Sequence, residues 1–168
     1  YRYFPEPDLT PIIIEQSFVD KTRENLPEMP AEKKQRFIRD YKIPQKDASI
    51  IISNKTLAHF YEDTVAFGVD PKVVDNYILG DMLRLLNVKG LEPEDITMDP
   101  KNLAHLIQVI DEGKISKTAG KEVFAEMFDT NKSPDVIIEE KGLAQISSSD
   151  ELEKLVDEVL KNNPQSIE

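Results

Sequence analysis

The chain has 168 residues, with 32 acidic and 21 basic side chains, and its formal charge is −11 at pH 7. A composition of 39% hydrophobic and 32% charged residues is typical of a folded globular protein and excludes a disordered acidic tail. The longest apolar runs, such as residues 12–14 and 50–52, are far too short to cross a bilayer, so no membrane partner is expected. The absence of cysteine excludes thiol catalysis, disulfides and thiolate metal sites, and it fits a reducing compartment. The net charge by itself argues against a nucleic-acid partner.

The first fifteen residues differ from the rest of the chain. Pro5, Pro7 and Pro11 precede the β-branched run 12–14, and this combination predicts an extended segment with turns. From residue 16 onward, capping residues, first-turn prolines and apolar side chains at helical spacing predict helix after helix. Ser17 is expected to cap the first of these helices, and Pro30 to open the second.

The predicted helices span residues 18–26, 31–41, 47–53, 56–67, 71–89, 100–112, 116–128, 134–141 and 150–161. No convincing alternating strand pattern occurs outside the N-terminal stretch, so the predicted fold class is all-α. The strongest helical pattern, residues 71–89, contains Gly80, which costs about 1 kcal/mol relative to alanine. The usual reason for such a glycine is the close approach of another helix, so Gly80 is expected to have a packing role.

The negative charge is concentrated in the second part of the chain. Residues 1–90 carry 13 basic and 14 acidic side chains, whereas residues 91–168 carry 8 and 18. The segment 90–95 combines a helix stop with Pro93, which indicates a linker or a domain boundary. One stretch interrupts the acidic part, because residues 113–121 contain three lysines and no acid.

The lysine-rich stretch resembles a phosphate-binding loop only superficially. Six residues rather than four separate Gly113 from Gly120, Glu122 follows the last lysine, and a helix rather than a strand precedes the stretch, so a Walker site is excluded. Lys114, Lys117 and Lys121 are spaced i, i+3, i+7, which places them on one face at the start of a helix. Such a face can contact phosphate or can simply be solvated, and the residues alone favour a solvated face.

Other candidates for chemistry are weak. His59, Glu62 and Asp63 have the spacing of metal ligands on one helical turn, but no second cluster supports them, and a surface histidine beside acids is favoured. His105 lies on the polar side of its predicted helix and is expected to be solvated. The sequence contains no G-x-S-x-G nucleophile motif, and no self-contained catalytic site emerges.

Several motifs along the chain resemble one known family. The string Tyr-Arg-Tyr-Phe-Pro-Glu-Pro-Asp-Leu at residues 1–9 closely resembles a signature of the B subunit of tRNA-dependent aspartyl/glutamyl-tRNA amidotransferases (GatB). Further similar positions are residues 27–30, 34, 36–37, 41, 47–48, 58–62, 76–81, 113–116, 121–124 and 142–147. Tyr77 stands where this family more often has tryptophan, and Gly120 stands where alanine is expected.

The resemblance implies a domain organisation. Residues 1–16 correspond to the end of a catalytic cradle domain, residues 17–92 to a helical domain, and residues 93–168 to part of a tail domain shared with YqeY proteins. The expected architecture is therefore two small helical bundles, the helical domain and a partial YqeY-like tail, preceded by a short extended segment. ATP and Mg²⁺ act in the cradle, so no catalytic, cofactor or metal site is expected in this chain, which alone should be inactive.

The function implied is to position tRNA for the parent subunit. That subunit is a cytoplasmic, ATP-dependent carbon–nitrogen ligase that converts Glu-tRNA(Gln) or Asp-tRNA(Asn) to the amidated form, with ammonia from glutamine. Its expected partners are the misacylated tRNA and the A (amidase) and C subunits. In this context Lys114, Lys117 and Lys121 become the predicted RNA contacts. The alternative is a stand-alone, YqeY-like protein-interaction module without RNA contact, and an independent hydrolase is a third reading that lacks a catalytic constellation.

Overall fold

The computed structural model describes residues 12–144, and in this range all regular structure is helical, with no strand. The α-helices are α1 (Gln16–Glu24), α2 (Pro30–Asp40), α3 (Gln45–Ser53), α4 (Lys55–Ala66), α5 (Pro71–Asn76), α6 (Leu83–Lys89), α7 (Pro100–Asp111), α8 (Lys117–Thr130) and α9 (Pro134–Lys141). A π-helix, η1 (Tyr77–Met82), joins α5 to α6, and a short 3₁₀ helix, η2 (Pro93–Asp95), lies between α6 and α7. The predicted all-α class is confirmed.

The predicted helices within the described range are confirmed to within two residues at each end. The predicted cap at Ser17 is wrong, because α1 already begins at Gln16 and Glu15 precedes it without a side-chain cap. Asn54 ends α3 and caps α4, since its side-chain oxygen accepts hydrogen bonds from the backbone N–H groups of Thr56 and Leu57. The predicted helix 150–161 lies outside the described residues.

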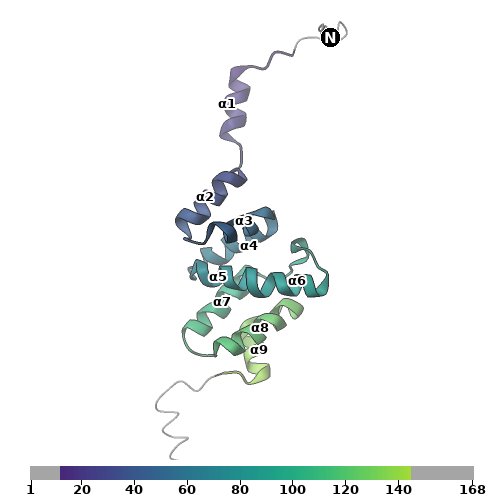
Figure 1. Cartoon of the computed structure of the whole chain (residues 1–168). Helices are drawn as coiled ribbons and strands as arrows, with labels where there is room; N and C mark the ends of the chain where they lie inside the picture. Colours follow the sequence, from purple (N-terminus) through teal and green to yellow (C-terminus); the bar gives the residue numbers. More distant parts are fainter. Residues whose placement is uncertain (1–11, 145–168) are drawn as a thin grey trace, which may run out of the picture.

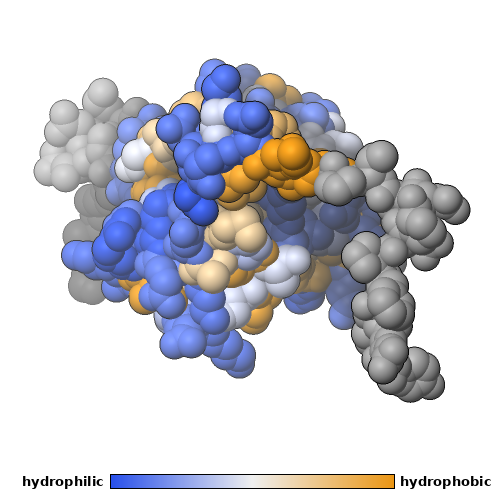
Figure 2. Space-filling model, turned by 90° about the horizontal axis from the view of Figure 1, so that it is seen from above, coloured by the Kyte–Doolittle hydropathy of each residue, from blue (hydrophilic) through white to orange (hydrophobic). Residues whose placement is uncertain are grey.

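Figure 1 shows α1 standing apart from the other helices, which stack on one another from α2 to α9. Residues 12–15 form no helix, and no residue of α1 is buried. Large apolar side chains are exposed in and around α1, as they are for Ile13 (86%) and Phe18 (64%). Hydrophobic residues also reach the surface of the face seen from above in Figure 2.

The buried side chains from α2 to α9 form one hydrophobic cluster. At one end, Phe37 of α2 packs against Tyr41 and Tyr61, with ring centroids 5.0 and 5.2 Å away. Further along, α4 packs against α7, and the ring of Tyr77 lies 5.1 Å from that of Phe124 in α8. The cluster includes residues before and after the segment 91–95. The division into domains at 1–16, 17–92 and 93–168 stays a prediction.

Candidate functional site

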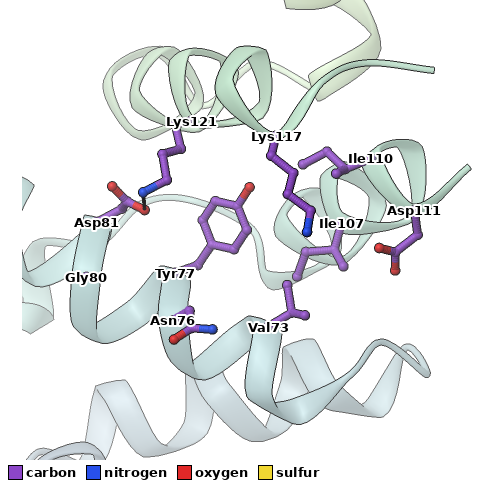
Figure 3. A pocket seen from close by; sticks show the side chains of 10 residues that line it. All are labelled: Val73, Asn76, Tyr77, Gly80, Asp81, Ile107, Ile110, Asp111, Lys117 and Lys121. Atoms are coloured by element: carbon purple, nitrogen blue, oxygen red, sulfur yellow. Dashed lines mark ion pairs between the residues drawn. The ribbon is translucent and has the colours of Figure 1, made fainter. Parts of the chain in front are cut away.

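A cleft of about 470 Å³ lies where the α5–η1 helix meets α7 and α8 (Figure 3). Its mainly apolar lining comes from Val73, Tyr77, Gly80, Ile107 and Ile110. Its remaining lining is polar or charged and comes from Asn76, Asp81, Asp111, Lys117 and Lys121. The cleft therefore combines an apolar floor with both cationic and anionic groups at its edge.

The helix that forms one wall of the cleft starts as the sequence predicts. The carboxylate of Asp70 accepts a hydrogen bond from the Lys72 backbone N–H at 2.9 Å, and Pro71 occupies the first turn. The π-helix that follows was not predicted. It covers Tyr77–Met82, so it overlaps the 76–81 stretch that resembles the GatB family. Single π-helical turns inside α-helices are frequent at functional sites, so this wall of the cleft is a candidate binding surface.

Tyr77 forms the centre of the floor. Its ring is almost fully buried against Phe124, whereas its hydroxyl points towards α8, between Lys117 and Lys121 in Figure 3. Burial, reinforced by the nearby carboxylates of Asp81 and Asp111, raises the pKa of Tyr77 to about 12. The hydroxyl thus stays protonated at neutral pH and can donate a hydrogen bond within the cleft.

The structure brings together two of the three predicted RNA-contacting lysines. Helix α8 begins at Lys117, and Ser116 caps it by accepting a hydrogen bond from the Ala119 backbone N–H at 3.1 Å. Lys121 lies one turn later, and its ammonium is 3.6 Å from the Asp81 carboxylate. Within residues 12–144, Lys117 has no carboxylate within 4.0 Å.

The third lysine lies elsewhere, so the expected single helical face is wrong for Lys114. This residue precedes α8 instead of belonging to it, because the helix starts only after the Ser116 cap. Its ammonium pairs with Glu112 at 2.7 Å, and its side chain is 64% exposed. RNA contact by any of the three lysines stays a prediction.

Two glycines have roles that differ from the sequence-based expectation. The predicted packing role of Gly80 is wrong, because a Cβ atom at this position would meet no described atom within 4 Å. Gly120 is the glycine at a close approach. A Cβ atom there would lie 2.4 Å from Cδ1 of Ile110 and 3.3 Å from the hydroxyl oxygen of Tyr77. Because glycine has no Cβ atom, α8 can approach the cleft floor this closely.

Substitution of the two glycines should therefore have opposite effects. Gly120→Val is expected to lower the free energy of unfolding by about 1–2 kcal/mol, because the added side chain must displace Ile110. Gly80→Ala serves as the matched control and should leave stability unchanged or raise it by up to about 1 kcal/mol. Urea unfolding followed by circular dichroism measures both. A Gly120→Val protein as stable as the parent would contradict the close approach.

The two histidines, His59 and His105, lie on different helices, α4 and α7. His59 is exposed, while Glu62 accepts hydrogen bonds from Arg36 and, at 2.6 Å, from Lys33, so this carboxylate joins α4 to α2. No group of three or more histidine, aspartate or glutamate side chains with metal-binding geometry occurs in the described part of the chain. His105 is not merely solvated, since its Nε2 lies 2.8 Å from the Asp135 carboxylate of α9.

Several residues of the cleft were not predicted as site residues. Asn76 and Asp81 lie in the family-like stretch with Gly80, and that stretch was the one available signal. Ile110 and Asp111 belong to a different helix, and no sequence pattern connects them to residues 76–81. Their proximity depends on how α7 packs against the α5–η1 helix.

A family model described as the GatB domain matches residues 59–168, which includes every residue that lines the cleft. The chain belongs to the GatB domain family. Several hundred curated proteins also match it. Proteins named as the B subunit of aspartyl/glutamyl-tRNA(Asn/Gln) amidotransferase are 53% identical in Clostridium beijerinckii, 43% in Caldicellulosiruptor bescii and 42% in Persephonella marina.

Each of these alignments covers the whole of this GatB-domain chain but only 35–36% of the relative. The chain thus spans about a third of the length of the curated proteins that it matches. The predicted relationship to GatB is confirmed. Among residues 12–144, no helix is long and apolar enough to cross a membrane.

Proposed function

We propose that this GatB-domain chain holds tRNA for an amidotransferase B subunit that converts Glu-tRNA(Gln) or Asp-tRNA(Asn) to the amidated form. The relatives that match over the whole chain carry the name of such a subunit, which supports this assignment. The ATP- and Mg²⁺-dependent ligase chemistry, the ammonia supply and the contacts with A and C subunits belong to the larger assembly. The described residues of the chain contribute binding surface rather than a catalytic constellation.

The observation that carries the RNA-binding role is the pair Lys117 and Lys121 at the edge of the cleft. The two lysines are one helical turn apart on α8, and both line the same depression. Lysine contacts to phosphate fix the position and orientation of a nucleic acid without reading its sequence. The two ammonium groups supply positive charge for this task in a chain that as a whole carries −11.

Removing both ammonium groups should weaken tRNA binding. For Lys117→Ala/Lys121→Ala we expect the affinity for tRNA to fall about tenfold at low salt, and the slope of log K against log salt to decrease in magnitude by about 1.5. Fluorescence anisotropy with labelled tRNA(Gln) transcript, titrated at several salt concentrations, measures both quantities.

The control is Lys46→Ala/Lys55→Ala, which changes the net charge equally on exposed residues of α3 and α4. An equal loss in both variants would show that overall charge, and not the cleft, governs binding. Unchanged affinity of the cleft variant would favour an interaction module without RNA contact.

A further inference from the structure

Gly80 has no structural explanation among the described residues. A glycine inside a helix lowers stability relative to alanine, and two features commonly justify it. One is a backbone conformation in the left-handed region, and Gly80 is absent from the glycines with positive φ. The other is close packing, and a Cβ atom at Gly80 would meet no described atom within 4 Å. The remaining common reason for glycine is the close approach of a ligand to the backbone.

The position of Gly80 fits this reason. It is exposed, and it lines the cleft within the π-helix, together with Val73 and Tyr77 on the preceding turns and Ile107 of α7. A volume of about 470 Å³ lies within the range of pockets that enclose small ligands or single chemical groups. A side chain at position 80 would fill part of this space.

The charges at the edge of the cleft have two signs, on different elements. Lys117 and Lys121 project from α8, while Asp81 belongs to η1 and Asp111 ends α7 (Figure 3). Such an edge suits a ligand with an anionic part and a part that donates hydrogen bonds. The Lys121–Asp81 pair is 3.6 Å long, so the lysine can exchange this carboxylate for a phosphate. Asp81 then keeps its pair with Arg84, at 3.7 Å, and its other oxygen can accept a hydrogen bond from a ligand.

We infer that the cleft binds one unpaired, unstacked nucleotide of the RNA, with its base over Gly80 and its phosphate at Lys117 and Lys121. This inference rests on the proposed function. Unstacked bases in RNA loops and ends are held on apolar or aromatic surfaces and read at their edges. Asp81 and Asp111 accept hydrogen bonds but cannot donate them when ionised. Bases whose exocyclic amino group offers two N–H donors should therefore be favoured over uracil, which offers only its N3–H and presents two carbonyl oxygens to the carboxylates.

The test compares hexanucleotides of adenosine, cytidine and uridine, labelled at the 5′ end, with the 168-residue chain in fluorescence anisotropy. We expect the adenosine and cytidine oligomers to bind at least fivefold more tightly than the uridine oligomer. Gly80→Leu, which fills the cleft without changing charge, should reduce their affinity to that of the uridine oligomer. Gly80→Ala should give an intermediate loss with full thermal stability, which separates occlusion from misfolding.

A second variant addresses base preference directly. Asp81→Asn keeps the size of the side chain but adds a donor, so it should reduce the preference for amino-bearing bases to less than twofold. Lys117→Ala/Lys121→Ala should weaken all three oligomers by similar factors, since every one of them carries phosphate.

The outcomes distinguish this inference from the proposed function. If the lysine variant binds tRNA more weakly but Gly80→Leu and Gly80→Ala bind every oligomer as the parent does, the nucleotide site is wrong and tRNA positioning stands. If the parent binds all three oligomers with equal affinity, the proposal that Asp81 and Asp111 recognise bases with an exocyclic amino group is wrong. If the lysine variant leaves tRNA binding intact, both proposals fail.

Discussion

Replacing Phe37 by alanine is expected to lower the free energy of unfolding by about 3–5 kcal/mol. Phe37 is fully buried and is the one buried residue of α2. Its ring contacts Tyr41 edge-on and stacks with Tyr61 of α4, so it fixes α2 to the helices that follow. Truncation removes a large apolar surface from the core and leaves a cavity beside two aromatic rings.

Urea unfolding of Phe37→Ala tests this expectation, and Phe37→Leu, which keeps most of the volume, should lose roughly half as much or less. The matched control is Phe67→Ala, because Phe67 follows α4 and is 48% exposed, so its loss should be about 1 kcal/mol or less. Similar losses for Phe37 and Phe67 would show that the aromatic cluster does not hold α2 in place.

Replacing Asp75 by asparagine is expected to raise the free energy of unfolding at pH 7 by about 1–3 kcal/mol. Asp75 is 6% exposed, and its Oδ1 has no hydrogen-bond partner among the described residues. Burial, followed by the charge of Asp47, raises the pKa of Asp75 from 3.8 to about 6. Ionised Asp75 is therefore destabilising in the folded chain, and asparagine keeps its shape without the charge.

The sign of the pH dependence follows from the raised pKa. Below about pH 4, Asp75 is protonated in the folded and the unfolded chain, so its burial carries no charge penalty. Between about pH 4 and 6 the unfolded chain ionises first, and stability falls as the pH rises through this window. The advantage of Asp75→Asn should accordingly be largest at pH 7 and shrink to less than half at pH 4.5.

Urea unfolding of both proteins at pH 7 and pH 4.5 measures the difference between their free energies of unfolding. Groups that titrate in the same way in both proteins cancel in this difference, and one of them is Glu62. Burial by itself raises its pKa, but hydrogen bonds from Lys33 and Arg36 outweigh burial and hold the pKa below its ordinary value. Asp63→Asn, on an exposed residue of α4, is the matched control and should change stability by less than about 0.5 kcal/mol. An Asp75→Asn chain no more stable than the parent at pH 7 would contradict the buried charge.

The sequence predicted helix positions well because helix signals are local. Asp70 with Pro71, and Asp99 with Pro100, each place a cap beside a first-turn proline, and both helices start where those residues stand. The cap at Ser17 failed because α1 is exposed along its length and no buried face fixes its first turn. The π-helix escaped prediction because side-chain spacing predicts a helix but does not show whether its backbone hydrogen bonds span four residues or five.

The candidate site was only partly predictable. Lys117 and Lys121 were found because their spacing is a property of one helix, whereas Lys114 was wrongly added to the same face. The partners across the cleft, such as Asp111, belong to other helices and carry no local signal.

The sequence by itself determined the all-α class, the helix positions to within two residues and the relationship to GatB, since these depend on short-range patterns along the chain. The tertiary structure alone decided that Gly120 and not Gly80 permits a close approach, and that Glu62 joins two helices. It also decided which lysines share a cleft. These features depend on contacts between helices far apart in sequence, and such contacts are fixed only when the apolar faces pack into one core.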